Sequence, residues 1–302
     1  MSVFEGVFVA AVTPRRDNST HIDLGAALDV IDYLCAAGAA GIALFGATGE
    51  FIHFDIEERI RVQGHAVRRS RVPVLVNVSH STLSGAVRLA EEAAAAGAAG
   101  LLLMPPCFYR YGRGEIQRFY QEFFEQTGPA PPLLLYNIPA FTSEIDIETA
   151  EDLILAGVAS GIKDSSGRWD YFQRLGELRR RKPFTLFVGN DALFTRGRGA
   201  GADGVVSGVA CAVPELMLAL DRAIVGGAAE PISRLQARLD EFLAWLDRFP
   251  TPVGVRRAVA LRGLTTGPLA VALSDAGEKD LGDYDAWFRT WLPEVIAETG
   301  QA

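Results

Sequence analysis

The sequence predicts a (β/α)8 barrel of the TIM-barrel type, an α/β fold, with an appended C-terminal helical region. Eight short apolar runs alternate with segments of helical periodicity, which is the pattern of a closed parallel barrel. The runs are continuously apolar, as strands buried on both faces require. The expected strands cover residues 7–12, 42–45, 74–78, 101–104, 133–136, 161–163, 185–188 and 204–207.

Seven expected helices connect these strands, at residues 24–36, 56–69, 83–95, 115–126, 147–155, 171–180 and 192–199. Gly38, Gly97 and Gly201 each stand where a helix can end in the left-handed conformation just before a strand. The candidate N-caps are Asp23, Asp55, Thr82 and Asp146. A doubly wound open sheet is disfavoured, because no Gly-x-Gly-x-x-Gly turn follows the first strand.

The chain stays helical after the eighth strand. Helical patterns cover residues 213–226, 231–249, 253–262 and 284–296, which is more than the single helix that closes a barrel. We therefore divide the chain into a catalytic barrel at residues 1–225 and a C-terminal helical region at residues 226–302.

Composition excludes several classes of function. The net charge of −8 argues against a nucleic-acid partner, because no basic stripe is available to neutralise phosphates. The N-terminal segment, residues 1–14, has a brief apolar run without a basic leader, which is too short for a signal peptide or a membrane span, and no membrane partner is expected. The cysteines Cys35, Cys107 and Cys211 lack Cys-x-x-Cys spacing, which indicates a reducing compartment and a cytoplasmic location. The four histidines lack metal-ligand spacing, so no metal site is expected.

Lys163 is the lysine most suited to chemistry. The chain has only three lysines, and Lys182 and Lys279 lie in charged surroundings typical of a surface. Lys163 follows Gly161 and Ile162 at the end of an apolar strand, and an amine in such a setting can become a nucleophile toward a carbonyl. The structural alternative is a salt bridge with Asp164, which would leave Lys163 without a chemical role.

Other polar residues gather at the C-terminal ends of strands, where barrels place their active sites. The turn at residues 46–50 contains Thr48 and can present backbone N–H groups to an anion, or it is a plain connecting turn. Tyr136 ends the fifth strand, where it is either a proton-transfer group beside Lys163 or a core tyrosine. Asp191 follows the seventh strand and either binds substrate hydroxyls or caps the next helix.

Together these motifs resemble the dihydrodipicolinate synthase / N-acetylneuraminate lyase superfamily of pyruvate-dependent class I aldolases. The resemblance rests on the segments at residues 48–50, 136–139, 161–164, 189–191 and 201–207, in this order and at these strand ends. It extends from residue 7 to about residue 225, and a weaker similarity occurs at residues 262–268.

The resemblance implies a role for each matching residue. Lys163 would form a Schiff base with a 2-keto acid, and Tyr136 would shuttle protons. The Ala47 and Thr48 N–H groups and the Val206 main chain would hold the pyruvyl carboxylate end. Gly189 and Asp191 would complete the substrate site. The resemblance implies no cofactor beyond the covalent imine, and it implies a homotetramer built as a dimer of dimers.

Three positions depart from the synthases of this superfamily. Those enzymes resemble this chain but have a second hydroxyl residue at the position of Ala47. At the position of Phe141 they have an arginine that binds the carboxylate of the aldehyde substrate. They also have, near the position of Phe108, a tyrosine that reaches the neighbouring subunit's site. In this chain Tyr109, shifted by one residue, would take the place of that tyrosine. Sialic-acid lyases have an acidic residue at the position where this chain has Ala192.

The leading hypothesis is a lyase that cleaves, or forms, a 2-keto-3-deoxy sugar acid from pyruvate and an aldehyde. A keto-deoxy sugar acid dehydratase is a close alternative, because the same imine can expel a hydroxyl group. Dihydrodipicolinate synthase (4-hydroxy-tetrahydrodipicolinate synthase), which condenses pyruvate with aspartate semialdehyde, ranks lower because the arginine is missing. The non-enzymatic alternative is a keto-acid-binding barrel without turnover.

Overall fold

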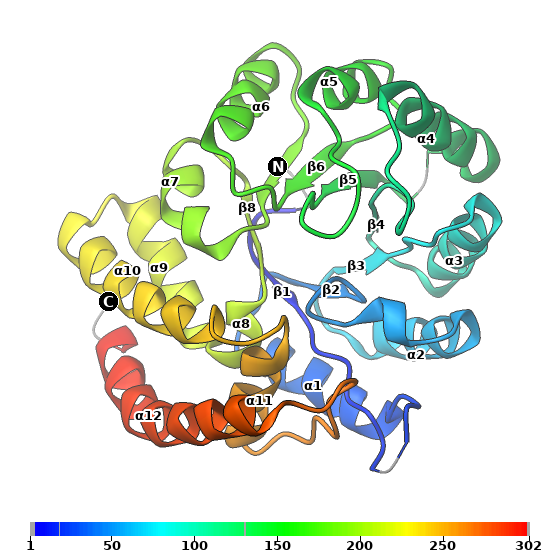
Figure 1. Cartoon of the computed structure of the whole chain (residues 1–302). Coiled ribbons are helices and arrows are strands. Elements are labelled where there is room, and N and C mark those ends of the chain that lie inside the picture. Colours follow the sequence, from blue (N-terminus) through cyan, green and yellow to red (C-terminus); the bar gives the residue numbers. More distant parts are fainter. Residues whose placement is uncertain (1–3, 18, 130, 301–302) are drawn as a thin grey trace.

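A computed structural model describes residues 4–17, 19–129 and 131–300 of the chain. Its eight strands form one closed barrel in sequence order, and every neighbouring pair is parallel. Figure 1 shows the strands at the centre with helices around them. The predicted (β/α)8 barrel is therefore confirmed.

The strands are β1 (Gly6–Ala10), β2 (Gly41–Leu44), β3 (Val74–Asn77), β4 (Gly100–Leu103), β5 (Leu133–Asn137), β6 (Gly161–Asp164), β7 (Thr185–Val188) and β8 (Gly204–Ser207). The α-helices between them are α1 (Leu24–Ala36), α2 (Ile56–Arg69), α3 (Leu83–Ala96), α4 (Arg113–Thr127), α5 (Ile147–Leu155), α6 (Trp169–Arg181) and α7 (Phe194–Gly199). Two short 3-10 helices, η1 (Phe51–His53) and η2 (Asp191–Leu193), follow β2 and β7.

The local signals in the sequence have the expected structural counterparts. Each of the four predicted N-caps accepts a hydrogen bond from the backbone N–H three residues later. Gly38, Gly97 and Gly201 have φ values of 88°, 90° and 99°, the left-handed conformation that ends a helix.

Some predicted boundaries were wrong. The first strand ends at Ala10, two residues early, and the helix expected at 192–199 is divided into η2 and α7, because the Asn190 side chain caps a 3-10 turn. The last helix begins well before residue 284, because Ser274 supplies an N-cap at its true start.

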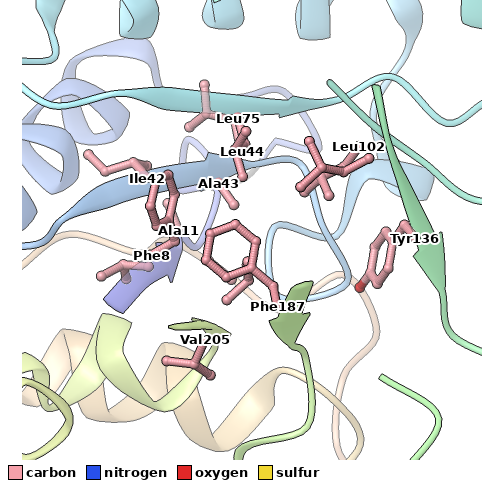
Figure 2. Close-up of a cluster of buried hydrophobic side chains, with 14 of the residues drawn as sticks. Phe8, Ala11, Ile42, Ala43, Leu44, Leu75, Leu102, Tyr136, Phe187 and Val205 are labelled. Atoms are coloured by element: carbon pink, nitrogen blue, oxygen red, sulfur yellow. The ribbon is translucent and has the colours of Figure 1, made fainter. Parts of the chain in front are cut away.

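Figure 2 shows buried hydrophobic side chains of the barrel, with labelled residues from β1, β2, β3, β4, β5, β7 and β8. Phe8 of β1 and Phe187 of β7 meet there with ring centroids 5.0 Å apart. A Cβ at Gly41 would lie 2.1 Å from the Phe8 ring, so only glycine leaves room for that ring on β2. The aromatic pair closes the interior, so that polar residues can gather only toward the strand ends.

The C-terminal helices are α8 (Val209–Ala212), α9 (Pro214–Gly226), α10 (Ala229–Leu246), α11 (Val253–Leu261) and α12 (Asp275–Thr299). Figure 1 shows α10 to α12 (yellow to red) on one side of the barrel, next to α8 and α9. The division that we predicted between residues 225 and 226 falls at the end of α9 and stays a prediction. Residues 1–3 and 301–302, at the outer ends of the two segments, lie outside the described residues. Of the helices described, none has the length and apolar character of a membrane span.

Candidate active site

A cavity of about 520 Å³ lies at the C-terminal ends of the strands. One wall comes from the C-terminal region, through Leu243 and Leu246 of α10 and the segment that follows it. Eight of the ten predicted site residues line this cavity: Ala47, Thr48, Tyr136, Phe141, Lys163, Gly189, Asp191 and Val206. Together with Ala10 of β1, these residues bring six strand ends to one space.

Lys163 and Tyr136 are neighbours across β5 and β6. The two residues pair in register, so their side chains point to the same side of the sheet. The Lys163 Nζ lies 3.9 Å from the centroid of the Tyr136 ring. Lys163 is only 4% exposed and forms no ion pair with any described residue. In Figure 2 the Tyr136 hydroxyl oxygen points from β5 toward the barrel interior, where no described residue bonds it.

The salt bridge considered between Lys163 and Asp164 does not form. Strand alternation turns Asp164 away from the cavity, where its carboxylate accepts hydrogen bonds from the Asn137 side chain (3.0 Å) and from the Ser166 N–H (3.1 Å). Burial raises the pKa of Asp164 to about 6, although these hydrogen bonds oppose the shift.

The turn after β2 offers free backbone donors to the cavity. The Ala47 and Thr48 N–H groups find no acceptor among the residues that the structure describes. The backbone of Gly208, after β8, comes close to Thr48, since a Cβ there would lie 2.9 Å from the Thr48 Oγ1. Unpaired N–H groups in a turn are a typical site for a carboxylate.

Asp191 and Ser165 each bring an unpaired buried oxygen to the cavity. The Asp191 Oδ1 and the Ser165 Oγ have no hydrogen-bond partner within the described parts of the chain. The capping role considered for Asp191 is wrong: Asn190 caps the following turn, and the Asp191 Oδ2 accepts from the Val209 N–H at 3.3 Å. Burial raises the pKa of Asp191, and a hydrogen bond from Ser207 opposes this shift.

A second lobe of about 320 Å³ adjoins the first and shares its Ala47, Tyr136 and Phe141. The lining that is not shared comes from the apolar Phe51, Ile52, Met104 and Cys107 and from the polar Glu50 and His53. Among the residues that the structure describes, no arginine lines either lobe, and Lys163 is the only lysine in the lining.

Phe108 and Tyr109 lie outside both lobes. Their side chains are 87% and 66% exposed, and their rings form an edge-to-face pair with centroids 5.0 Å apart. Phe108 has a φ of 82°, which is strained for a residue with a side chain.

No group of three or more His, Cys, Asp or Glu residues among those described is placed to hold a metal ion.

Comparison with known proteins identifies the family. A sequence profile of the Dihydrodipicolinate synthetase family matches residues 3–277, which is most of the chain. The chain belongs to this family. The family-level resemblance inferred from the strand-end motifs is thus confirmed, and membership makes the chain a lyase of the pyruvate aldolase type.

Relatives in the dihydrodipicolinate synthetase family are similar over nearly their whole length. The 4-hydroxy-tetrahydrodipicolinate synthase of Methanothrix thermoacetophila is 30% identical, with 93% of this chain and 96% of that protein covered. A DapA-like lyase of Halobacterium salinarum is also 30% identical, at 92% and 91% coverage. The solved 4-hydroxy-tetrahydrodipicolinate synthase of Methylacidiphilum fumariolicum SolV is 26% identical, with a TM-score of 0.85 and coverage of 98% and 99%.

Two features of the cavity were missed by the sequence analysis. Ser165 follows Lys163 by two residues, so strand alternation would have indicated that it faces the same side. The wall formed by Leu243, Leu246 and the segment after α10 had no local signal, because nothing in a helical pattern tells where the helix packs.

The raised pKa of Asp164 generates a prediction about stability. Because its folded-state pKa of about 6 exceeds the ordinary value of 3.8, the folded protein holds this proton more tightly than the unfolded chain. The contribution of Asp164 to the free energy of unfolding therefore falls by about 3 kcal/mol as the pH rises from about 4 to about 6, and is level above that window. The near-isosteric Asp164→Asn variant cannot titrate, so wild type should lose stability relative to it over this window in urea unfolding.

The control for this measurement is Asp283→Asn, which changes an exposed carboxylate on α12. This variant controls for the loss of one carboxylate from the protein. A constant difference between wild type and Asp164→Asn from pH 4 to pH 7 would contradict the prediction.

Proposed function

We propose that this protein is a Schiff-base-forming class I lyase that cleaves a 2-keto-3-deoxy sugar acid to pyruvate and an aldehyde, or catalyses the reverse condensation. The proposal rests on the surroundings of Lys163. A buried lysine without an ion pair, against a tyrosine ring and in a cavity with open N–H donors, is suited to bind a ketone covalently.

The proposed chemistry begins at the C2 ketone of the substrate. The Lys163 amine adds to it and water leaves, which gives a protonated imine. The electrons of the C3–C4 bond then move toward the imine nitrogen and form an enamine, while the C4 hydroxyl loses its proton and becomes the aldehyde. Protonation at C3 and hydrolysis of the imine release pyruvate and restore the amine. Because the imine is itself the electron sink, we propose no further cofactor.

Tyr136 is the group that we propose for the proton transfers. Its ring contacts the Lys163 amine, and its hydroxyl has no other partner among the described residues. The open Ala47 and Thr48 N–H groups would hold the pyruvyl carboxylate, and the main chain of Val206, which lines the same cavity, would contact the same group.

The unpaired oxygens of Ser165 and Asp191 support a hydroxylated substrate. A buried polar atom without a partner is costly, so a ligand that supplies the missing hydrogen bonds gains affinity. Sugar-acid hydroxyl groups can donate to both oxygens. A dehydratase of the same substrates would use the same contacts, and it remains the alternative that differs only in which bond breaks.

Dihydrodipicolinate synthase activity is the second candidate, because several relatives bear that name. The cavity lining argues against it. Aspartate semialdehyde carries a second carboxylate, and neither lobe offers an arginine or a lysine besides Lys163 to bind one. Ala47 and Phe141 place apolar groups in the lining instead.

We also propose a homotetramer, built as a dimer of dimers, in which Phe108 and Tyr109 contact another subunit. Two adjacent exposed aromatic rings, one on a strained residue, are typical of a contact surface. We expect a small keto acid as ligand and neither nucleic acid nor membrane. The free thiols of Cys35, Cys107 and Cys211 support a cytoplasmic location, which recovery from a membrane or periplasmic fraction would contradict.

The first prediction concerns the imine. Pyruvate and borohydride should leave a reduced pyruvyl adduct on Lys163, located by peptide mass, and Lys163→Ala should lose turnover on the order of a thousandfold or more. Tyr136→Phe should lose about 100-fold or more while still forming the adduct slowly. Lys279→Ala, an exposed lysine on α12, is the matched control and should behave as wild type. Failure of the folded protein to form the adduct would overturn the mechanism.

The second prediction concerns the substrate. In a panel of 2-keto-3-deoxy sugar acids, at least one should release pyruvate, and Ser165→Ala should raise its KM about tenfold while leaving pyruvate trapping unchanged. Ser84→Ala, on the exposed face of α3, is the control. Consumption of the sugar acid without pyruvate would identify a dehydratase. Condensation of pyruvate with aspartate semialdehyde, with no sugar acid cleaved, would rule out the proposed substrate class.

The third prediction concerns assembly. Sedimentation velocity of wild type should show a tetramer, and Phe108→Asp should shift it toward smaller species because a charge would be buried in the contact. Val271→Asp changes another exposed apolar side chain and should leave the tetramer intact. A wild-type monomer at micromolar concentration would refute the proposal.

A further inference from the structure

Glu50 is a buried carboxylate at the end of the turn that follows β2. It is 8% exposed and has a φ of 50°, a conformation that non-glycine residues adopt only when their surroundings hold them there. Its carboxylate forms ion pairs with Arg15 (3.1 Å) and Arg256 (2.8 Å). The side chain is thus fixed from two directions.

The two arginines come from distant parts of the chain. Arg15 follows β1 and is 2% exposed, whereas Arg256 lies on α11 in the C-terminal region and is 1% exposed. The Arg256 Nη1 also donates to the Thr13 carbonyl at 2.8 Å. Its Nη2 donates to the carbonyls of Thr266, Gly267 and Pro268. Arg256 therefore connects α11 to the segment after β1 and to the turn after β2.

The turn itself has little freedom. The Thr13 hydroxyl donates to the Gly49 carbonyl at 2.8 Å, and the Glu50 N–H donates to the Ala47 carbonyl at 3.0 Å. A Cβ at Gly49 would lie 3.0 Å from the Phe45 backbone, so the chain is tightly packed at this point. The free Ala47 and Thr48 N–H groups lie between these fixed points.

We propose that Arg256 and Glu50 are positioning residues that orient the Ala47 and Thr48 N–H groups toward the pyruvyl carboxylate. This inference rests on the proposed function, which places the carboxylate in that turn. A helix of the C-terminal region thereby sets the affinity of the barrel for its keto acid.

The test uses the full-length protein and measures borohydride trapping on Lys163 against pyruvate concentration. Arg256→Met and Glu50→Gln should each raise the half-saturating pyruvate concentration about tenfold, because misaligned donors weaken charge-assisted hydrogen bonds. Trapping at saturating pyruvate should change little, since Lys163 and Tyr136 are untouched. Arg256→Lys keeps the charge and should recover most of the affinity. Glu50→Gln preserves the side-chain shape, so it tests the proposal even if Arg256→Met fails to fold.

Pyruvamide separates carboxylate binding from general damage. This neutral analogue has the ketone but no carboxylate charge, so its trapping should be similar in wild type and variants. Arg198→Met is the matched control, because Arg198 is largely buried (10% exposed) and also forms an ion pair, with Asp221 at 2.9 Å, but lies outside the cavity lining. It should leave the half-saturating pyruvate concentration unchanged.

The outcomes are distinguishable. An unchanged half-saturating concentration in folded Glu50→Gln and Arg256→Met would overturn the inference while leaving the proposed function intact. An equal effect in Arg198→Met, or an equal loss with pyruvamide, would also overturn it. Absence of any wild-type adduct on Lys163 would overturn the proposed function, and the inference with it.

Discussion

The register between β5 and β6 decides what surrounds Lys163. Tyr136 pairs with Lys163 and Asn137 pairs with Asp164, so the members of each pair point to the same side of the sheet. The first pair faces the cavity, and the second forms a buried hydrogen bond away from it. The amine consequently lies against a phenol ring although a carboxylate is its neighbour in sequence. An amine held in an ion pair would have to leave it before adding to a ketone, so this separation suits the proposed imine chemistry.

The C-terminal helices are part of the site. Leu243 and Leu246 of α10 form one wall of the cavity, and α10 is held in place by aromatic contacts with α12. Trp245 stacks on Trp287 and Phe242 stacks on Trp291, with centroids 5.5 Å and 5.4 Å apart. Contacts of this kind stabilise a fixed arrangement of the two helices. The barrel supplies the reacting groups, and the appended region encloses the space in which they act.

Charge is distributed unequally in the cavity. Lys163 is the only lysine or arginine in its lining, and the arginines nearest the turn are already bound to Glu50. The site can therefore bind one carboxylate through backbone N–H groups but offers no second cation. The unpaired oxygens of Ser165 and Asp191 can form hydrogen bonds with neutral hydroxyl groups. This combination favours a keto acid whose distal part is uncharged.

The sequence alone predicts the barrel, most strand limits to within one residue, and the gathering of Lys163, Tyr136, Thr48 and Asp191 at one end. These follow from local signals, namely apolar runs, glycine helix ends and N-caps, and from the rule that parallel strands in a barrel end together. The tertiary structure was needed to show that Asp191 does not cap the helix that follows it and that Glu50 binds Arg256, 206 residues away. It also decided that α10 closes the cavity. Periodicity reports which face of an element is apolar, but it carries no information about which distant segment packs there.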